Sequence, residues 1–238
     1  MGKLPSFIEK RLIGKIWQQP FYENLHRISL RGMNYMQSQS IEVSGERFAM
    51  QYANSKRKGK VVLFDVGANV GDYSEVLSRE FKHDFKIHAF EPSKKLFQSL
   101  QTKFRTDPNI AIHGIGFSDA NKILTLYNAG DLYGTVYPTH QNETQSENIE
   151  LETIDGFCIK NEIDSIYYLK IDVEGAEMDV LKGAKQMIDS NAIQFIQFEF
   201  GPKCFRSKNF SQRFFLNIGQ LSNLQNLKRR TSTFTSVS

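Results

Sequence analysis

The sequence predicts an α/β protein built on a doubly wound, Rossmann-like and mainly parallel sheet. The first observation is that apolar runs of strand length recur at residues 61–64, 86–90, 110–116, 166–173 and 193–200. The second is that amphipathic helical patterns separate most of these runs, an alternation that implies parallel pairing with right-handed crossovers. The third is that the first run leads directly into a glycine-containing turn, the position at which such folds bind ligands.

The segment from residue 61 to residue 74 is the most informative part of the chain. Residues 61–64 are β-branched, aliphatic or aromatic without a polar interruption, as expected for a parallel strand that is covered on both faces. Gly67 and Gly71 let the backbone approach a ligand that a Cβ atom would exclude, and the following helix presents unpaired N–H groups at its start. We therefore expect a nucleotide-like ligand at this turn.

The details of the turn distinguish between classes of nucleotide. The dinucleotide fingerprint needs three glycines as G-x-G-x-x-G, whereas this turn has Gly67-x-x-x-Gly71, and no phosphate-binding G-x-x-x-x-G-K-[ST] motif is present. Asp65 at the strand end would repel a phosphate group, but it suits a cationic or zwitterionic ligand. S-adenosylmethionine (SAM) has a sulfonium, an ammonium and no phosphate, so the turn favours SAM over NAD.

A second acid follows at the end of the next strand, residues 86–90. Glu91 comes 20 positions after Gly71, where an acid in a doubly wound fold accepts hydrogen bonds from ribose hydroxyls. Pro92 stops the strand, and Ser93 can cap the helix that follows. The alternative interpretation of Glu91 is a solvated surface carboxylate.

The remaining elements are predicted from local patterns. Residues 1–58 read as helical and then irregular, with a short hairpin near residues 41–50. Short β-like pieces after residue 116 resemble strands that are added to the sheet edge or folded over the site, at residues 123–127, 133–137 and 149–151. Helices are expected at residues 154–160 and from residue 176 to residue 188.

Acidic residues surround the end of the strand at residues 166–173. Asp172 and Glu199 end two successive strands, so they would lie side by side if these strands pair. Two such carboxylates could hold Mg²⁺ through their oxygen atoms, or one could act as a general base. Glu174 and Glu177 fall in the first helical turn, where acids stabilise the helix dipole, and for Glu177 this structural role is the preferred interpretation.

Length, charge and cysteine content limit the function. The 238 residues fit an N-terminal helical extension, residues 1–58, and one SAM-binding domain, residues 59–238. The net charge of +4, from 30 basic and 26 acidic residues, is too small to indicate nucleic-acid binding. Two cysteines give neither a disulfide framework nor a metal-binding spacing, which fits a reducing cytoplasm. No apolar run has the length of a membrane span.

The first 20 residues contain an apolar line, Ile8, Leu12 and Ile16, with basic residues beside it. A helix of this kind could make a peripheral contact with an anionic membrane. Packing of the helix on its own domain is the preferred interpretation.

Five segments, DVGANVGDYS, FEPS, GFSD, LKIDVEGAE and QFEFG, occur in an order and spacing that resemble the FkbM family of class I methyltransferases. The resemblance covers roughly residues 30–201, and LKIDVEGAE is its most specific segment. It implies that residues 59–238 form a SAM-dependent O-methyltransferase domain. The acceptor would be a hydroxyl of a sugar, glycan, glycolipid or polyketide-like molecule.

The resemblance also implies the roles of individual residues. The methionine side of SAM would be lined by Asp65, Gly67, Asn69 and Gly71; the ribose would contact Glu91; and the adenine would lie near Ser118 and Asp119. Asp172 and Glu174 would face the methyl-transfer site, where Asp172 would orient or deprotonate the attacking hydroxyl. His88 and His140 are weaker alternatives for this base. Catechol-type O-methyltransferases have metal-binding carboxylates at these two strand ends, which suggests Mg²⁺ at Asp172 and Glu199.

The C-terminal end departs from the family pattern. Class I methyltransferases usually finish with a helix and an antiparallel pair of strands, but 38 residues follow Phe200, and only a helix over residues 210–224 is predicted there. A truncated end would leave a sheet edge exposed, or available to pair with another subunit in a homo-oligomer. Two functions stay open: an active methyltransferase, and a SAM-binding module without turnover, either degenerate or a partner in a glycan-synthesis complex.

Overall fold

The computed structural model of the chain describes residues 16–32, 46–127, 146–173, 175–200 and 212–217. Its helices are η1 (Ile16–Gln18), α2 (Gln19–Gly32), α3 (Glu46–Lys56), α4 (Asp72–Phe81), α5 (Lys94–Lys103), α6 (Ile154–Lys160), α7 (Glu177–Gly183) and α8 (Lys185–Asp189). Its strands are β1 (Val61–Val66), β2 (Phe85–Phe90), β3 (Ile110–His113), β4 (Gly116–Phe117), β5 (Lys122–Tyr127), β6 (Ser146–Glu152), β7 (Ile166–Ile171), β8 (Ile193–Phe200) and β9 (Gln212–Asn217).

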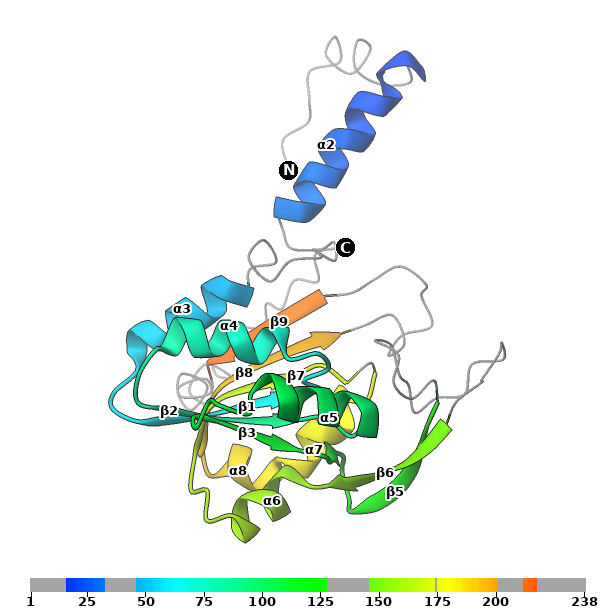
Figure 1. Ribbon diagram of the computed structural model, residues 1–238. Coiled ribbons are helices and arrows are strands. Elements are labelled where there is room, and N and C mark those ends of the chain that lie inside the picture. Colours follow the sequence, from blue (N-terminus) through cyan, green and yellow to red (C-terminus); the bar gives the residue numbers. More distant parts are fainter. Residues whose placement is uncertain (1–15, 33–45, 128–145, 174, 201–211, 218–238) are drawn as a thin grey trace, which may run out of the picture.

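The main sheet has the strand order β3-β2-β1-β7-β8-β9 (Figure 1). All pairings from β3 to β8 are parallel, and β9 is antiparallel to β8. The order reverses between β1, which continues to β2 and β3, and β7, which continues to β8. The predicted doubly wound, mainly parallel fold is therefore confirmed, and the carboxyl ends of β1 and β7 meet at the reversal point, where such sheets bind ligands.

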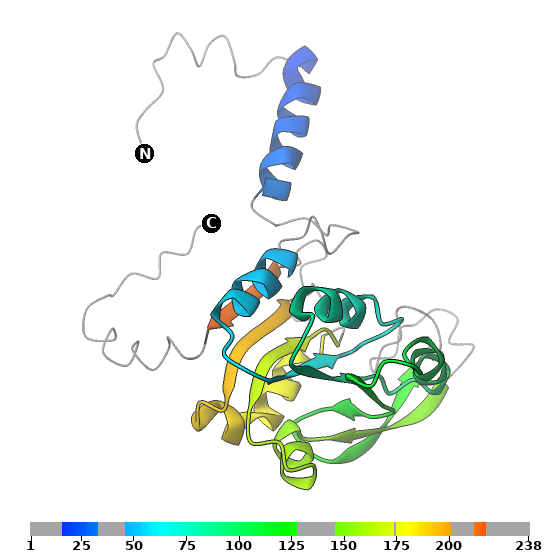
Figure 2. The same cartoon turned by 60° about the vertical axis from the view of Figure 1, so that its left-hand side comes forward.

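Helices cover both faces of this sheet. On one face, α3, α4 and α5 bury Met50, Leu77 and Leu100 against the sheet, and on the other face α6 and α7 bury Phe157 and Val180. The strands alternate accordingly: odd-numbered positions of β1 face the first group of helices, and even-numbered positions face the second. Figure 2, turned by 60°, shows the two helical layers on either side of the strands.

The short strands after β3 are arranged differently from the prediction. They do not extend the main sheet; β4, β6 and β5 form a separate three-stranded sheet, in which β5 is antiparallel to β6. The reason is that the predicted strand at 110–116 is broken after His113, so Gly116 pairs with Leu151 of β6. The predicted piece at residues 133–137 lies outside the described residues.

Two further expectations need correction. Residues 46–50 belong to helix α3 and not to a hairpin, because Met50 and Ala53 are spaced to bury one helical face against the sheet. Residues 212–217 form strand β9 and not part of a helix, because Gln212–Asn217 pairs along the outer edge of β8. The sheet edge at β8 is therefore covered by an antiparallel strand of the same chain. The domain boundary at residue 58 stays a prediction.

Candidate cofactor site

The turn between β1 and α4 forms the centre of the candidate site. Gly67, Asn69 and Gly71 have left-handed φ angles of 76°, 51° and 84°. The N–H groups of Gly67 and Ala68 both donate to the carbonyl of Phe90 at 3.0 Å, which ties the turn to the end of β2. The N–H group of Gly71 donates to the carbonyl of Ala68 at 2.8 Å. Gly71 is also the residue that directly precedes α4.

The two glycines are required by packing inside the protein. A Cβ atom on Gly67 would lie 1.9 Å from the carbonyl oxygen of Asp172. A Cβ atom on Gly71 would lie 2.6 Å from side-chain atoms of Leu100 and Phe104 in and after α5. The sequence analysis gave close approach of a ligand as the reason for these glycines; the structure supplies an independent reason, which is contact with β7 and with α5.

Asp65 is completely buried and is paired within the fold. Its Oδ2 accepts a hydrogen bond from Ser74 Oγ at 2.7 Å, and its Oδ1 lies 3.0 Å from Nζ of Lys170. The same ammonium donates to the carbonyl of Gly67 at 2.9 Å and lies 3.7 Å from Oδ2 of Asp172. Lys170 therefore joins the end of β1, the glycine turn and the end of β7.

The sequence analysis did not identify Lys170 as a site residue. The sequence does contain a signal for it, namely a lysine within the otherwise apolar strand at residues 166–173. A buried lysine rarely lacks a charged partner, so an acidic neighbour could have been expected. Burial by itself lowers the pKa of Lys170, but the neighbouring carboxylates of Asp65 and Asp172 outweigh this effect and raise the pKa above its ordinary value. The side chain is therefore a buried ammonium.

Glu91 lies at the end of β2 and is 6% exposed. Its two carboxylate oxygens accept hydrogen bonds from the backbone N–H of Asn69, at 2.9 Å, and of Ser93, at 3.0 Å. Burial raises the pKa of Glu91, although these two N–H groups act in the opposite direction. The alternative of a solvated surface carboxylate is wrong, since Glu91 is buried and holds the glycine turn against β2.

Asp172 follows β7 and has a 40% exposed side chain, in contrast to the fully buried Asp65. Its backbone N–H donates to the carbonyl of Val66 at 3.0 Å. Glu174 lies outside the described residues. Glu177 lies in the first turn of α7, as predicted. Its carboxylate also accepts hydrogen bonds from the N–H groups of Val173 and Gly175, a contact with the preceding loop that was not predicted.

Ser118 and Asp119 lie at the end of β4, on the three-stranded sheet. The N–H of Ser118 donates to the carbonyl of Glu152, and its hydroxyl donates to Asp119 Oδ1 at 3.1 Å. Asp119 is also paired with Lys122 at 2.8 Å, which lowers the pKa of the carboxyl. Gly116, two residues before Ser118, lies near the end of β2, since a Cβ atom on it would lie 3.4 Å from the ring of Pro92.

The carboxylate pair proposed for magnesium receives no support from the described residues. In the parallel register Ile171 is opposite Phe198, so Asp172 and Glu199 do occupy neighbouring positions at two strand ends. No group of three or more His, Cys, Asp or Glu residues within the described part of the chain could hold a metal ion. The Lys170 ammonium is the cation that faces Asp172.

A buried polar chain continues from Lys170 beneath the turn. Nζ of Lys170 lies 5.1 Å from the ring centroid of Tyr73. The hydroxyl of Tyr73 lies 3.1 Å from that of Tyr168 and donates to Gln197 Oε1 at 2.9 Å. Gln197 Nε2 in turn donates to Glu46 Oε1 at 3.2 Å. The first residue of α3 is thereby connected to the site.

The histidine alternatives for a general base are not supported. His88 Nδ1 lies 3.0 Å from His113 Nε2, with the two rings stacked in an aromatic cluster that includes Phe90 and Phe157. His88 is on the face of the sheet opposite Lys170, with Phe64. His140 lies outside the described residues.

None of the helices in the described part of the chain combines the length and apolar character that crossing a bilayer requires.

Comparisons with known proteins bear on the family of the chain. "Methyltransferase 1" of Beauveria bassiana is 28% identical over 144 residues, which are 51% of this chain and 57% of that protein. The hexuronic acid methyltransferase AglP of Haloferax volcanii is 26% identical over 166 residues, which are 66% of this chain and 62% of that protein. The chain thus spans less than two thirds of the length of these curated relatives.

A solved structure of an FkbM methyltransferase from Methylobacillus flagellatus KT aligns with a TM-score of 0.43 and 19% identity, covering 77% of this chain and 50% of that one. The family model for the methyltransferase FkbM domain matches residues 65–219. This match begins at Asp65, near the end of β1, and includes the glycine turn, Glu91 and the whole of β7; it extends over more than half of the chain. The protein therefore belongs to the FkbM family of methyltransferase domains.

Proposed function

We propose that this protein is a SAM-dependent O-methyltransferase, which transfers a methyl group to a hydroxyl of a sugar, glycan, glycolipid or polyketide-like acceptor. The observation that carries the proposal is the meeting of three elements at the carboxyl edge of the sheet. These are the left-handed turn after β1, the buried acid Glu91 after β2 and the exposed acid Asp172 after β7.

The chemistry around the turn suits SAM better than a phosphate-containing ligand. Two described lysines contact the turn, and both are already engaged. Lys170 is bound by Asp65, Asp172 and the carbonyl of Gly67, and Lys103, which donates to the carbonyl of Val70, is paired with Asp72 and Glu75. In this proposal the turn holds the methionine part of SAM, and Glu91 accepts hydrogen bonds from the ribose hydroxyls. The adenine would lie toward Ser118 and Asp119. When bound, SAM supplies the electrophilic methyl group.

Asp172 is the residue proposed to act on the acceptor. Its side chain is exposed, whereas Asp65 and Glu91 are buried, so it is the one of these three carboxylates that a second substrate could reach. The ion pair with Lys170 orients the carboxylate. As the acceptor oxygen takes the methyl group, its proton would pass to Asp172; orientation and proton removal are the main requirements of such a transfer.

The choice of a sugar-type hydroxyl draws on one relative. The Haloferax volcanii protein, 26% identical, is named as a hexuronic acid methyltransferase. A panel of hydroxylated acceptors should therefore begin with hexuronic acids and hexuronic acid-containing glycans.

The cofactor can be tested by calorimetric titration of the purified full chain with SAM and, separately, with NAD⁺. We expect saturable binding of SAM and none of NAD⁺. Binding of NAD⁺ alone, or no binding of either by a folded sample, would contradict the proposal. Saturable SAM binding without methyl transfer to any acceptor of the panel would favour the non-catalytic alternative.

The role of Asp172 can be tested by Asp172→Asn. We expect unchanged SAM affinity and a loss of transfer of about 10² to 10⁴-fold, the usual contribution of a general base. Asp164→Asn is a matched control, because Asp164 is an exposed acid just before the opposite end of the same strand. If Asp172→Asn instead weakens SAM binding alone, Asp172 belongs to the cofactor site and not to the proton transfer.

A further inference from the structure

Helix α2 and the η1 turn before it leave a row of large apolar side chains in solvent. Trp17 is 74% exposed, Phe21 65%, Leu25 48% and Ile28 65%. The spacing of four and three residues places Phe21, Leu25 and Ile28 within about 60° of the α2 circumference, and Trp17 precedes Phe21 by four residues, in η1. Other exposed large apolar residues, such as Phe48 and Ile159, are scattered singly over different elements, which is ordinary for a protein surface. The row is therefore a continuous apolar stripe.

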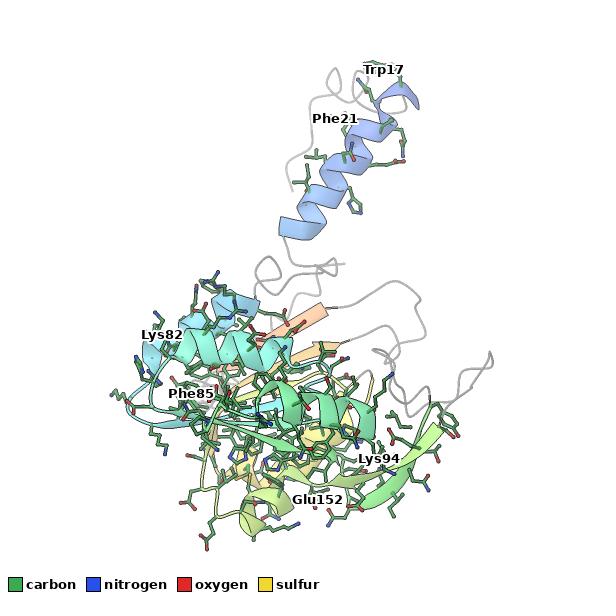
Figure 3. The ribbon with its side chains drawn as sticks, in the orientation of Figure 1. Trp17, Phe21, Lys82, Phe85, Lys94 and Glu152 are labelled. Atoms are coloured by element: carbon green, nitrogen blue, oxygen red, sulfur yellow. The ribbon has the colours of Figure 1, made fainter. Side chains whose placement is uncertain are left out.

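This stripe does not pack on the layered domain. Figures 1 and 2 show α2 projecting away from the sheet and its covering helices in both views. Figure 3 shows the side chains of Trp17 and Phe21 at the end of α2 that is farther from the sheet. The sequence interpretation for the apolar line of Ile8, Leu12 and Ile16, a helix packed on its own domain, stays a prediction, because Ile8 and Leu12 lie outside the described residues.

The charge of the chain is concentrated in the same region. Residues 1–32 contain six basic residues and two acidic ones, so this segment carries the whole net charge of +4: residues 16–32 contribute +1, and residues 1–15, which precede them in the sequence, contribute +3. The other residues contain 24 basic and 24 acidic side chains and have no net charge. An apolar stripe in a cationic segment is complementary to a surface with an apolar interior beneath an anionic outer layer: the stripe would contact the interior, and the basic residues would contact the outer layer.

We infer that this N-terminal helix, residues 16–32, is an interfacial anchor that binds the surface of a membrane containing anionic phospholipids. An amphipathic helix of this kind lies in the plane of the interface, with its apolar side chains among the upper acyl chains. Tryptophan and phenylalanine suit this depth, and nearby basic residues are attracted to anionic headgroups. At 14 residues, α2 is about 21 Å long and too short to span the hydrocarbon core.

A second copy of the chain is the competing occupant of the stripe. Two copies would bring together two segments of charge +4, which repel each other, whereas an anionic surface attracts each one. The charge distribution thus favours the membrane. The inference is independent of the proposed methyl transfer, because it rests on α2 and not on the turn after β1.

The chain carries its own probe for the test. Trp17 is the only tryptophan, and it lies in the stripe, so its fluorescence reports directly on this surface. The full chain should be titrated with vesicles of phosphatidylcholine alone and with vesicles that also contain phosphatidylglycerol. We expect a shift of Trp17 emission to shorter wavelength and co-sedimentation with the anionic vesicles, both reduced in high salt. Neutral vesicles should give neither effect.

A double substitution distinguishes membrane binding by the stripe from nonspecific adsorption of exposed apolar side chains to the vesicles. Phe21→Gln with Ile28→Gln keeps good helix formers in α2 and should lower the vesicle partition coefficient at least about tenfold. The matched control is Phe48→Gln with Ile159→Gln, also one phenylalanine and one isoleucine on helices, 72% and 73% exposed, and it should leave partitioning unchanged. Light scattering of each protein in solution gives its oligomeric state.

Three results would overturn the inference: no binding to anionic vesicles, equal losses in both double variants, or a dimer in solution that Phe21→Gln with Ile28→Gln converts to a monomer. Calorimetric SAM binding by each variant would show that the domain is folded. Loss of vesicle binding with SAM binding retained is the expected pattern. If the unsubstituted chain does not bind SAM, the result counts against the proposed function. The vesicle result can still be interpreted in that case, because circular dichroism shows whether each protein is folded.

Discussion

Lys170 and the His88–His113 pair lie on opposite faces of the main sheet, and burial has different outcomes for them. Lys170 stays charged, because Asp65 and Asp172 raise its pKa despite the cost of burial. Burial lowers the pKa of His88 and of His113 to about 4, and the opposing effect of the Glu152 carboxylate on His113 does not outweigh it, so both are neutral near pH 7.

This difference in charge state shows which face of the sheet can hold the charged groups of the candidate site. A charge can be kept inside a protein only where an opposite charge and hydrogen bonds offset its desolvation. The face toward α3, α4 and α5 provides this at the end of β1 and β7, next to the glycine turn. The face toward α6, α7 and α8 holds an aromatic cluster around His88 and His113, in which both imidazoles lose their charge. Four predictions test this distinction, from the largest expected effect to the smallest.

Lys170→Met should lower the free energy of unfolding by about 3–5 kcal/mol, because it leaves Asp65 buried without its cation. Urea denaturation followed by circular dichroism measures the change. The double variant Asp65→Asn with Lys170→Met should recover a large part of the loss, since it removes the orphaned charge. A single-variant loss below about 1 kcal/mol would mean that the polar face does not depend on this ion pair.

Gly67→Ala should cost about 3 kcal/mol, because the added methyl group combines a strained left-handed φ with a clash against the Asp172 carbonyl. Gly59→Ala is the control: it has a φ of 72° but no atom within 4 Å of the new Cβ, so only backbone strain of about 1 kcal/mol is expected. Equal losses in the two variants would show that the contact between the turn and β7 contributes little. Thermal unfolding distinguishes the outcomes.

The histidine pair should make the protein less stable in acid. The unfolded chain binds protons at these residues below about pH 6.5, whereas the folded protein resists protonation until about pH 4, so stability falls as the pH falls through this window. Because both rings are partly exposed, we expect a total loss of about 2 kcal/mol.

Urea denaturation at pH 7 and at pH 4.5 measures this loss. It should shrink in His88→Leu with His113→Leu and persist in His83→Asn, which changes an exposed histidine. An unchanged pH dependence in the double variant would remove the contrast between the two faces.

Tyr168→Phe should lower stability by about 1 kcal/mol, because the hydroxyl bonds to Tyr73 and Gln197 within the buried polar chain. Tyr167→Phe removes a hydrogen bond to the carbonyl of Ala53 at a half-buried position, and we expect about half that loss. A larger loss in Tyr167→Phe would show that the polar chain below the turn is not a connected unit. Parallel urea denaturation curves are sufficient for this comparison.

The main strands and the turn between β1 and α4 could be predicted because their signals are local. Four apolar residues, a glycine turn and a helical repeat are contiguous in the chain, and the strand-end positions of Glu91 and Asp172 follow from the strand boundaries. Parallel pairing then follows from the alternation of strands and helices, whereas the order of the strands is seen only in the structure.

The second sheet, β9 and α3 could not be predicted correctly from the same kind of signal. Gly116 pairs with Leu151 and not with a neighbour in the main sheet, and β9 forms only because the edge of β8 is available to it. Short segments of this kind have weak intrinsic preferences, so their partners determine their structure.

The sequence by itself determined the fold class, the glycine turn and the acids at the strand ends, because each is specified by neighbouring residues. The tertiary structure decided which of these acids are available. Lys170 reaches the carbonyl of Gly67 across 103 positions of sequence, buries Asp65 in an ion pair and leaves Asp172 exposed. No local pattern contains that information, because the charge state and exposure of a carboxylate depend on the groups that folding brings around it.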